Sequence, residues 1–334
     1  MRHNDALDGL RGLAAATVVI SHFSNRTHAL AGLFGIGAGM MGVMLFFVLS
    51  GFLMGRLYLD SPPSGAAIAT FYRRRIARVV PLYLIVVGLS YYAGQYCQDS
   101  YFPPVGSDNV WEHLLFWRGI EVFWTLPVEV QFYVVFPLMW LAFARNPSTT
   151  VLGLVFLVAL VDLLGFPKIP PVLGYIPFFV AGILASRFRA THGEGMNALF
   201  LCALVVYVLM LPQVRAGLGL DALLAGAAPS KRPWESWLYL LTATLVILTG
   251  AAAPVARTIF GSRPLRYLGT ISYSLYLLHP PVLRALHDVP ALHDSPALIA
   301  PVFVAALLLV ASLSYFLVEA PFRRLINGPE RAAR

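Results

Sequence analysis

The chain has 334 residues, of which 58% are hydrophobic and only 12% are charged, and its formal net charge is +8. Soluble domains carry about 25% charged residues, so this composition excludes an ordinary soluble fold. The positive net charge does not indicate nucleic-acid binding, because the basic residues are spread between apolar segments and form no single patch. The sequence therefore predicts an integral membrane protein.

Hydrophobic segments of the length that crosses a bilayer, about 17 to 25 residues, recur along the whole chain. Prolines mark most of the breaks between these segments. We therefore predict an all-α, polytopic membrane bundle of about ten transmembrane helices. The predicted helices cover residues 7–24, 38–59, 76–95, 123–144, 149–166, 172–189, 196–212, 235–253, 267–287 and 297–318.

Residues 1–334 are expected to form one transmembrane domain without an appended soluble domain, because no loop is long enough to hold one. No cleavable signal peptide is expected, so the first apolar segment should remain as a helix. Cys97 and Cys202 show no spacing typical of a disulfide framework or a metal site. The sequence predicts neither a bound metal nor a nucleic-acid partner.

The distribution of basic residues predicts that both termini are cytoplasmic. With ten spans and a cytoplasmic N-terminus, seventeen of the 24 Lys and Arg residues fall on the cytoplasmic side and seven on the outer side. This is the bias that the positive-inside rule requires, and an odd number of helices would remove it. The asymmetry therefore supports both the number of spans and their orientation.

Arg11 and His22 are titratable groups in the first predicted helix. They are eleven residues apart, which is about three helical turns, so they should lie nearly on one face and about 16 Å apart along the axis. Titratable groups within a membrane are costly and are functional candidates by default. The alternative is an arginine that extends to the lipid headgroups and a histidine at the interface, with no catalytic role.

The arrangement of Arg11, ten intervening residues and His22 resembles a motif of the acyltransferase 3 family, membrane enzymes that O-acylate glycans, lipids and some natural products. Further segments are similar to that family and occur in the same order along the chain. They are GVMLFFVLSGFL at 42–53, FYRRRIARVVPLY at 71–83, FWTLPVEVQFYVVFP at 123–137, LGTISYSLYLLH at 268–279 and VEAP at 318–321. One departure is Met44, where many members have a polar or acidic residue, so no carboxylate role is expected at that position.

The resemblance implies transfer of an acyl group, with acetyl expected, from cytosolic acyl-CoA to a hydroxyl group. The acceptor would be a glycan, a lipid-linked sugar or a glycosylated small molecule. The expected location is the bacterial cytoplasmic (inner) membrane, with membrane lipids as surrounding partners. An imidazole titrates near neutral pH, so His22 is the expected general base. Direct transfer and an acyl-histidine intermediate both remain open.

Glu129 is a carboxylate within a predicted span and is the second catalytic candidate. It would orient His22 or bind the acceptor, or it would instead pair structurally with an arginine such as Arg11 or Arg118. Ser50, beside a glycine that allows close backbone approach, would donate a hydrogen bond to the oxyanion or only pack two helices.

Arg75 and Arg78 belong to the densest run of basic residues and are the expected donor contacts, because guanidinium groups suit phosphate oxygens. Arg11 would lie beside the entrance for the pantetheine arm. The alternative explanation of the run is membrane topology and binding of anionic lipids.

Tyr133, Tyr273 and His279 are expected to line the acceptor site or to hold helices together. His279 is also a second candidate for the general base. A different class of function, a secondary transporter or flippase, would also place charged groups in the membrane. The absence of an evident internal repeat weighs against this alternative. A third possibility, a non-catalytic membrane protein on the same scaffold, predicts loss of the arginine and histidine motif, yet both residues are present.

Overall fold

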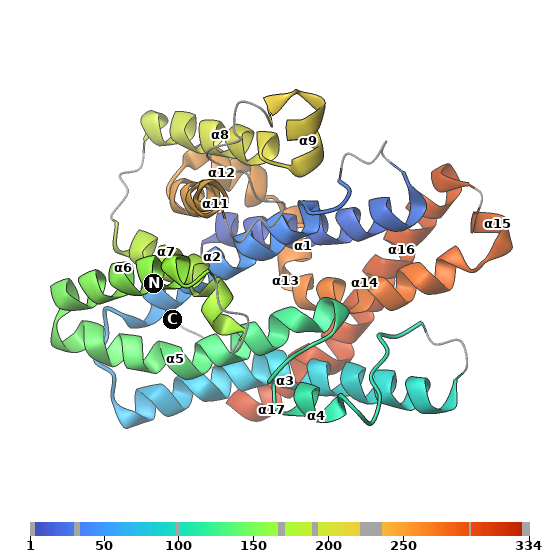
Figure 1. Cartoon of the computed structure of the whole chain (residues 1–334), viewed down its shortest axis with the longest axis horizontal. Helices are drawn as coiled ribbons and strands as arrows, with labels where there is room; N and C mark the ends of the chain where they lie inside the picture. The colour runs from blue at the N-terminus through green and yellow to red at the C-terminus, as the bar shows by residue number, and fades with distance from the viewer. Residues whose placement is uncertain are drawn as a thin grey trace. The chain divides into compact units, whose positions relative to one another are not determined.

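The computed structural model describes residues 4–29, 34–97, 101–165, 171–188, 193–220, 236–293 and 295–328. These residues form helices and connecting turns, and no strand occurs among them (Figure 1). The chain divides into two compact units, Met1–Ser61 with Ala142–Ser272 and Pro62–Leu141 with Tyr273–Arg334. The residues at the two ends of the chain, including Arg2, Arg331 and Arg334 of the topology prediction, lie outside the described residues.

The first unit contains nine named helices. They are α1 (Asp5–Thr27), α2 (Ala38–Tyr58), α6 (Pro147–Leu163), α7 (Val172–Arg187), α8 (Glu194–Leu209), α9 (Pro212–Gly217), α11 (Trp237–Gly250), α12 (Pro254–Phe260) and α13 (Arg263–Thr270) among the described residues. The second unit contains most of α5 (Thr125–Arg145) and almost all of α14 (Ser272–His287). Its other helices are α3 (Gly65–Tyr96), α4 (Val110–Leu114), the 3₁₀ helix η2 (Glu121–Trp124), α15 (Pro290–His293), α16 (Pro296–Ser314), the π-helical turn η4 (Tyr315–Glu319) and α17 (Ala320–Asn327).

Each of the ten predicted helical ranges overlaps an observed helix, and the main differences occur at helix ends. The predicted helix 76–95 begins earlier, at Gly65, because Ser64 caps it by accepting a hydrogen bond from the Ala67 N–H at 3.2 Å. Hydropathy missed this start because the added turns carry arginines. The predicted helix 267–287 is interrupted at Ile271, where α13 ends and α14 follows.

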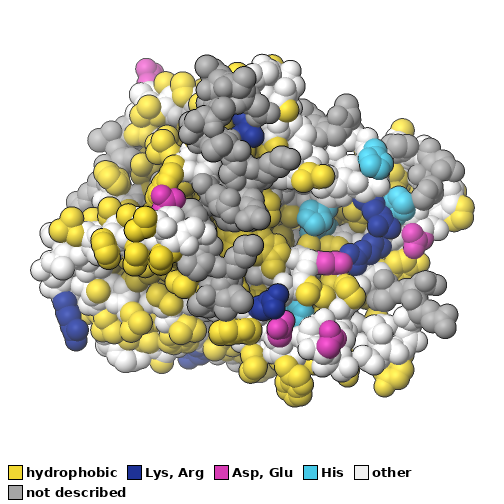
Figure 2. Space-filling model, viewed as in Figure 1, with side chains coloured by type: hydrophobic (Ala, Val, Ile, Leu, Met, Phe, Trp, Pro, Cys, Tyr) yellow, Lys and Arg dark blue, Asp and Glu magenta, His cyan; other side chains and the backbone are white. Residues whose placement is uncertain are grey.

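In the described part of the chain, four helices are long and apolar enough to cross a membrane, or five if the bent pair α11 and α12 forms one span. The four are Ala38–Tyr58, Gly65–Tyr96, Glu121–Arg145 and Ala297–Asn327, and α6, α7 and α8 are shorter apolar helices. Figure 2 shows hydrophobic side chains spread over the viewed face, as expected of a surface in contact with lipid. These features indicate a membrane protein, and the count of ten spans stays a prediction.

The core of the first unit is the close contact between α2 and α7, which run side by side (Figure 1). A Cβ added at Gly51 would lie 2.0 Å from the carbonyl oxygen of Phe179, and one added at Gly182 would lie 2.0 Å from that of Val48. The Phe47 ring stacks on Phe179 with ring centroids 4.7 Å apart. Glycine on both helices therefore lets the two backbones touch, as is common where membrane helices associate.

In the second unit, α4 is attached to α3 through a buried histidine. The Tyr83 hydroxyl lies 3.1 Å from Nδ1 of His113. The Tyr83 ring also stacks on Phe116 at 4.9 Å between centroids. Arg284 extends this attachment by binding the Glu121 carboxylate at 2.5 Å and the Tyr101 carbonyl oxygen at 3.0 Å. The connection between the spans α3 and α5 is thus held by specific side chains.

Acidification is expected to destabilise this attachment. Burial lowers the pKa of His113 from its ordinary value of 6.5, and the nearby Glu112 opposes this effect only in part. As the pH falls through 6.5, the unfolded chain binds this proton before the folded protein does, so stability is lost. The melting temperature of the purified protein should therefore fall less between about pH 7 and pH 5 in His113→Gln than in the wild type.

The matched control for this prediction is His28→Asn, which removes an exposed histidine at the end of α1. The control should keep the pH dependence of the wild type. An unchanged pH dependence in His113→Gln would contradict the prediction.

Candidate functional site

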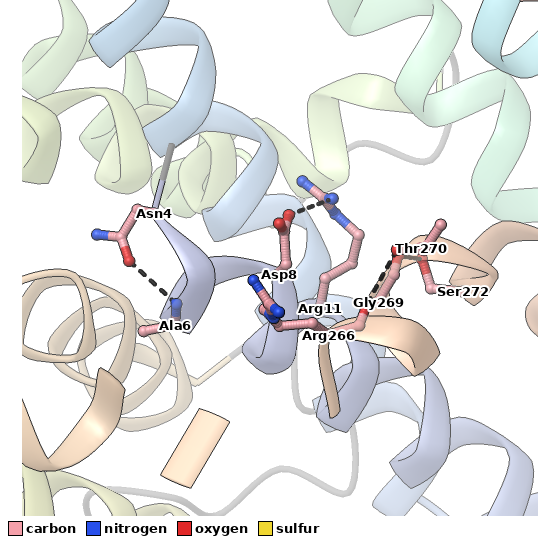
Figure 3. Close-up of polar contacts among 8 residues, drawn as sticks. All are labelled: Asn4, Ala6, Asp8, Arg11, Arg266, Gly269, Thr270 and Ser272. Atoms are coloured by element: carbon pink, nitrogen blue, oxygen red, sulfur yellow. Dashed lines mark hydrogen bonds and ion pairs between the residues drawn. The ribbon is translucent and has the colours of Figure 1, made fainter. Parts of the chain in front are cut away.

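The first predicted pair, Arg11 and His22, lies on one continuous helix, α1. This helix begins where the Asn4 side chain accepts a hydrogen bond from the Ala6 N–H at 3.1 Å, and Asp5 and Asp8 follow in its first turn. Acidic side chains at the N-terminal end of a helix stabilise it through a favourable interaction with the helix dipole. The Arg11 guanidinium forms an ion pair with Asp8 at 3.1 Å (Figure 3).

His22 lies near the C-terminal end of α1, where this helix meets the start of α2. The neighbouring Ser21 hydroxyl is buried and donates a hydrogen bond to the Gly35 carbonyl oxygen at 3.0 Å. A Cβ added at Gly39 would lie 3.2 Å from Ser21 Oγ and 3.8 Å from His22 Cδ2. The small residue at position 39 therefore leaves space beside the imidazole, and His22 itself is partly exposed.

Ser50 lies on α2, directly before the glycine that contacts α7, and its side chain is partly exposed. This position is compatible with the packing role. The oxyanion role of Ser50 stays a prediction.

In the second unit, two aromatic rings lie against Arg75, and one of them is hydrogen-bonded to a carboxylate. The guanidinium carbon lies 5.9 Å from the centre of the Phe71 ring and 5.8 Å from that of Tyr133, distances typical of cation–π contacts. The Tyr133 hydroxyl donates a short hydrogen bond to Glu129, one turn earlier on α5. Arg78 is also close enough to act electrostatically on Tyr133. Residues from α3 and α5 thus form one charged group within membrane-spanning helices.

The last helices of the unit extend this group. The Tyr273 hydroxyl donates to the Val79 carbonyl oxygen of α3 at 2.7 Å, and Glu129 and Glu319 both act electrostatically on Tyr273. The Ser274 hydroxyl contacts Glu319 at 2.5 Å and Ser314 at 2.9 Å. Arg78 interacts electrostatically with the buried Glu319 as well.

Glu319 belongs to the VEAP segment at 318–321, and its expected role from the sequence is to line the acceptor site or to hold helices together. Its sequence signal was present, because it is a charged residue at the end of an apolar run and before Pro321. It also closes the π-helical turn η4, and such turns often occur at functional sites.

His279, the second candidate base, is completely buried. Its Nδ1 lies 2.7 Å from the Tyr276 carbonyl oxygen, so Nδ1–H donates to that oxygen. The Tyr276 hydroxyl in turn accepts from Thr125 at 3.0 Å and donates to the Val122 carbonyl oxygen at 2.8 Å. This network ties α14 to the start of α5 and gives His279 a structural environment.

The structure therefore brings five of the predicted residues into one group in the second unit. They are Arg75, Arg78, Glu129, Tyr133 and Tyr273. Arg118, one of the suggested structural partners of Glu129, lies 3.7 Å from Glu112. Among the described residues, no group of three or more His, Cys, Asp or Glu side chains is arranged to hold a metal ion.

Comparisons with known proteins give the family. Residues 4–318 match the acyltransferase 3 family, described as an acyltransferase domain. The chain is 25% identical to the peptidoglycan O-acetyltransferase OatA of Listeria monocytogenes, with 97% of this chain and 56% of that protein covered. It is 23% identical to the O-acetyltransferase OatA of Staphylococcus aureus, with 97% of this chain and 58% of that protein covered.

The chain thus spans a little over half the length of these curated relatives. No solved structure matches it. The family match covers the segments that carry Arg11, His22, Arg75, Arg78, Glu129 and Tyr273, and it ends one residue before Glu319. The chain therefore belongs to the acyltransferase 3 family of membrane acyltransferases, and its relatives are O-acetyltransferases.

Proposed function

We propose that this protein transfers an acyl group, with acetyl expected, from cytosolic acyl-CoA to a hydroxyl group of a glycan or a glycosylated compound. The acyltransferase family match supports the reaction class. The names of the relatives, one of which is a peptidoglycan O-acetyltransferase, support a glycan as acceptor. In this proposal residues 1–334 form one acyltransferase domain in the bacterial cytoplasmic membrane.

The chemistry requires a base for the hydroxyl proton and donors for the developing oxyanion. We assign the base to His22. Its imidazole takes the proton of the acceptor hydroxyl as that oxygen attacks the thioester carbonyl carbon. The carbon–sulfur bond then breaks, the imidazolium returns the proton to the thiolate, and the products are an ester and coenzyme A. Ser50 is the proposed oxyanion donor.

The observation that carries the proposal is the accessibility of His22 relative to His279. His22 is partly exposed beside Gly39, whereas His279 is completely buried and donates to the Tyr276 carbonyl oxygen. A general base must come within hydrogen-bond distance of the proton that it removes. Of these two histidines, the partly exposed His22 is the one that supports the proposed role of the base.

The residues of the charged group in the second unit are proposed to bind the two substrates. Arg75 and Arg78 would bind the phosphates of coenzyme A, because guanidinium groups form strong charge-assisted hydrogen bonds with phosphate. Glu129, with the Tyr133 hydroxyl bound to it, would orient a catalytic or acceptor group. Tyr273 would line the acceptor site.

The decisive test is an acyl-transfer assay on the purified protein in nanodiscs, with acetyl-CoA labelled in the acetyl group and with peptidoglycan fragments or lipid-linked sugars as acceptors. Labelled ester should form, and coenzyme A should be released in equal amount. Movement of a labelled sugar across the membrane without coenzyme A release would instead favour the transporter or flippase alternative.

Replacing Arg75 by glutamine is expected to raise the KM for the acyl donor by about tenfold, the effect of one lost charge-assisted contact, with a smaller change in kcat. Arg75→Lys should recover little, because lysine lacks the planar group that lies over Phe71 and Tyr133. Steady-state kinetics with acetyl-CoA as the varied substrate measure both values.

Arg73→Gln is the matched control, because Arg73 is an exposed arginine two residues earlier on α3. This control should change the KM less than about twofold, within the range of ordinary surface substitutions. Equal effects of the two variants would show that only the total charge of α3 matters.

A further inference from the structure

The N-terminal end of α1 and the neighbouring α13 carry two arginines and two aspartates, which form two ion pairs. Arg11 pairs with Asp8 at 3.1 Å, and Arg266 pairs with Asp5 at 3.0 Å. Figure 3 shows Asp8, Arg11 and Arg266 gathered at this end of the helix. Of the two arginines, only Arg11 is a site candidate from the sequence, since Arg266 is 255 positions further along the chain.

Glycines bring these two helices together. A Cβ added at Gly269 would lie 1.9 Å from the Asp8 carbonyl oxygen, and one added at Gly12 would lie 2.8 Å from that of Leu265. The backbones of α1 and α13 are therefore in direct contact. Arg266 lies one turn before Gly269, so the contact holds the base of its side chain against the first turns of α1.

The ion pairs are partly accessible. The side chains of Arg11 and Asp8 are 15% and 21% exposed, and those of Arg266 and Asp5 are 38% and 37% exposed. Nε of Arg266 is buried and has no hydrogen-bond partner within the part of the chain that the structure describes. An ion pair that solvent can reach contributes little to stability. An anion that binds arginine more strongly can therefore displace Asp5 or Asp8 from its guanidinium group.

We propose that Arg11 and Arg266 form a phosphate-binding site and that Asp5 and Asp8 hold the two guanidinium groups in place while the site is empty. A phosphate offers several acceptor oxygens to two planar guanidinium groups, and it carries more charge than a carboxylate. The phosphate belongs to the coenzyme A donor or to a phospholipid headgroup. The first source rests on the proposed function, whereas the second does not.

The site predicts opposite effects for its two kinds of residue. Arg266→Gln removes a phosphate ligand and should weaken phosphate binding by about tenfold. Asp5→Asn removes the competing carboxylate and should strengthen binding by about threefold, in keeping with the small value of an exposed ion pair. Damage to the fold would weaken binding in both variants, so opposite signs distinguish a ligand site from a structural role.

The test measures binding to the full-length protein without turnover. Coenzyme A and 3′-dephospho-coenzyme A are titrated into protein in phosphatidylcholine nanodiscs, and native mass spectrometry measures retained phosphatidylglycerol in a parallel arm. Arg263→Gln, on the exposed side of α13, is the matched control and should change neither measurement. The melting temperature of each variant reports its folding.

A selective change in coenzyme A affinity supports the donor phosphate as ligand, and a selective change in phosphatidylglycerol retention supports the lipid headgroup. Equal losses in Arg266→Gln and Arg263→Gln, or weaker binding in Asp5→Asn, would overturn the proposal. Since no transfer is measured, these results stand even if an acyl-transfer assay rejects His22 as the base.

Discussion

Replacing His22 by alanine is expected to lower acyl transfer by at least about 100-fold, because a positioned general base contributes about 10² to 10⁴-fold to such reactions. The protein should remain folded, because the imidazole is partly exposed. The measurement is the initial rate of labelled ester formation at saturating acetyl-CoA. Binding of coenzyme A should change little, which separates loss of chemistry from loss of donor binding.

The matched control is His28→Asn, six residues further along the same segment. His28 ends α1 with a positive φ of 55°, a backbone conformation that asparagine adopts readily. This variant should keep the wild-type rate. Retained transfer in His22→Ala would move the base to another group, and Glu129→Gln and His279→Ala would then be the variants to assay.

Replacing Gly182 by alanine is expected to cause a large loss of stability in the first unit. The new Cβ would lie 2.0 Å from the Val48 carbonyl oxygen, and both atoms belong to helix backbones that cannot rotate away. The two helices must therefore separate, and overpacking of this kind costs about 1 to 3 kcal/mol. The melting temperature in detergent should fall by several degrees, and the rate of thermal inactivation should rise.

Gly153→Ala provides the comparison. It introduces the same change into α6 of the same unit, at a position where a Cβ meets no atom within 4 Å. Alanine has a higher helix propensity than glycine, so this variant should be unchanged or slightly more stable. Similar losses in both variants would indicate that the glycines matter only through helix propensity, and the close contact between α2 and α7 would lose its support.

The periodicity and length of the apolar segments predicted where the helices lie, because these features depend on neighbouring residues alone. The ends of the helices were less well predicted. The early start of α3 depends on the Ser64 cap, and the break at Ile271 lies inside the single helical range, 267–287, that hydropathy predicted. Hydropathy averages over a window and does not detect either feature.

The sequence likewise predicted some residues of the candidate site, whereas the contacts between other residues became visible only in the structure. Arg11 and His22 could be identified from their spacing, since one helix determines their separation. The contact of Arg75 with Tyr133, and that of Ser274 with Glu319, could not be identified in this way. These contacts join segments that are far apart in the chain, and sequence spacing contains no information about which helices become neighbours.

The sequence by itself determined that this protein is a helical membrane protein, because composition and helix length depend on neighbouring residues alone, and the order of its motifs carried the resemblance to acyltransferases. Only the tertiary structure decided that α2 touches α7 through glycines, that α3, α5 and α14 share one charged group, and that Arg266 joins Arg11 at the start of α1. The physical reason is that these arrangements follow from close backbone packing between distant segments, where the absence of a side chain at one position decides which helices can meet.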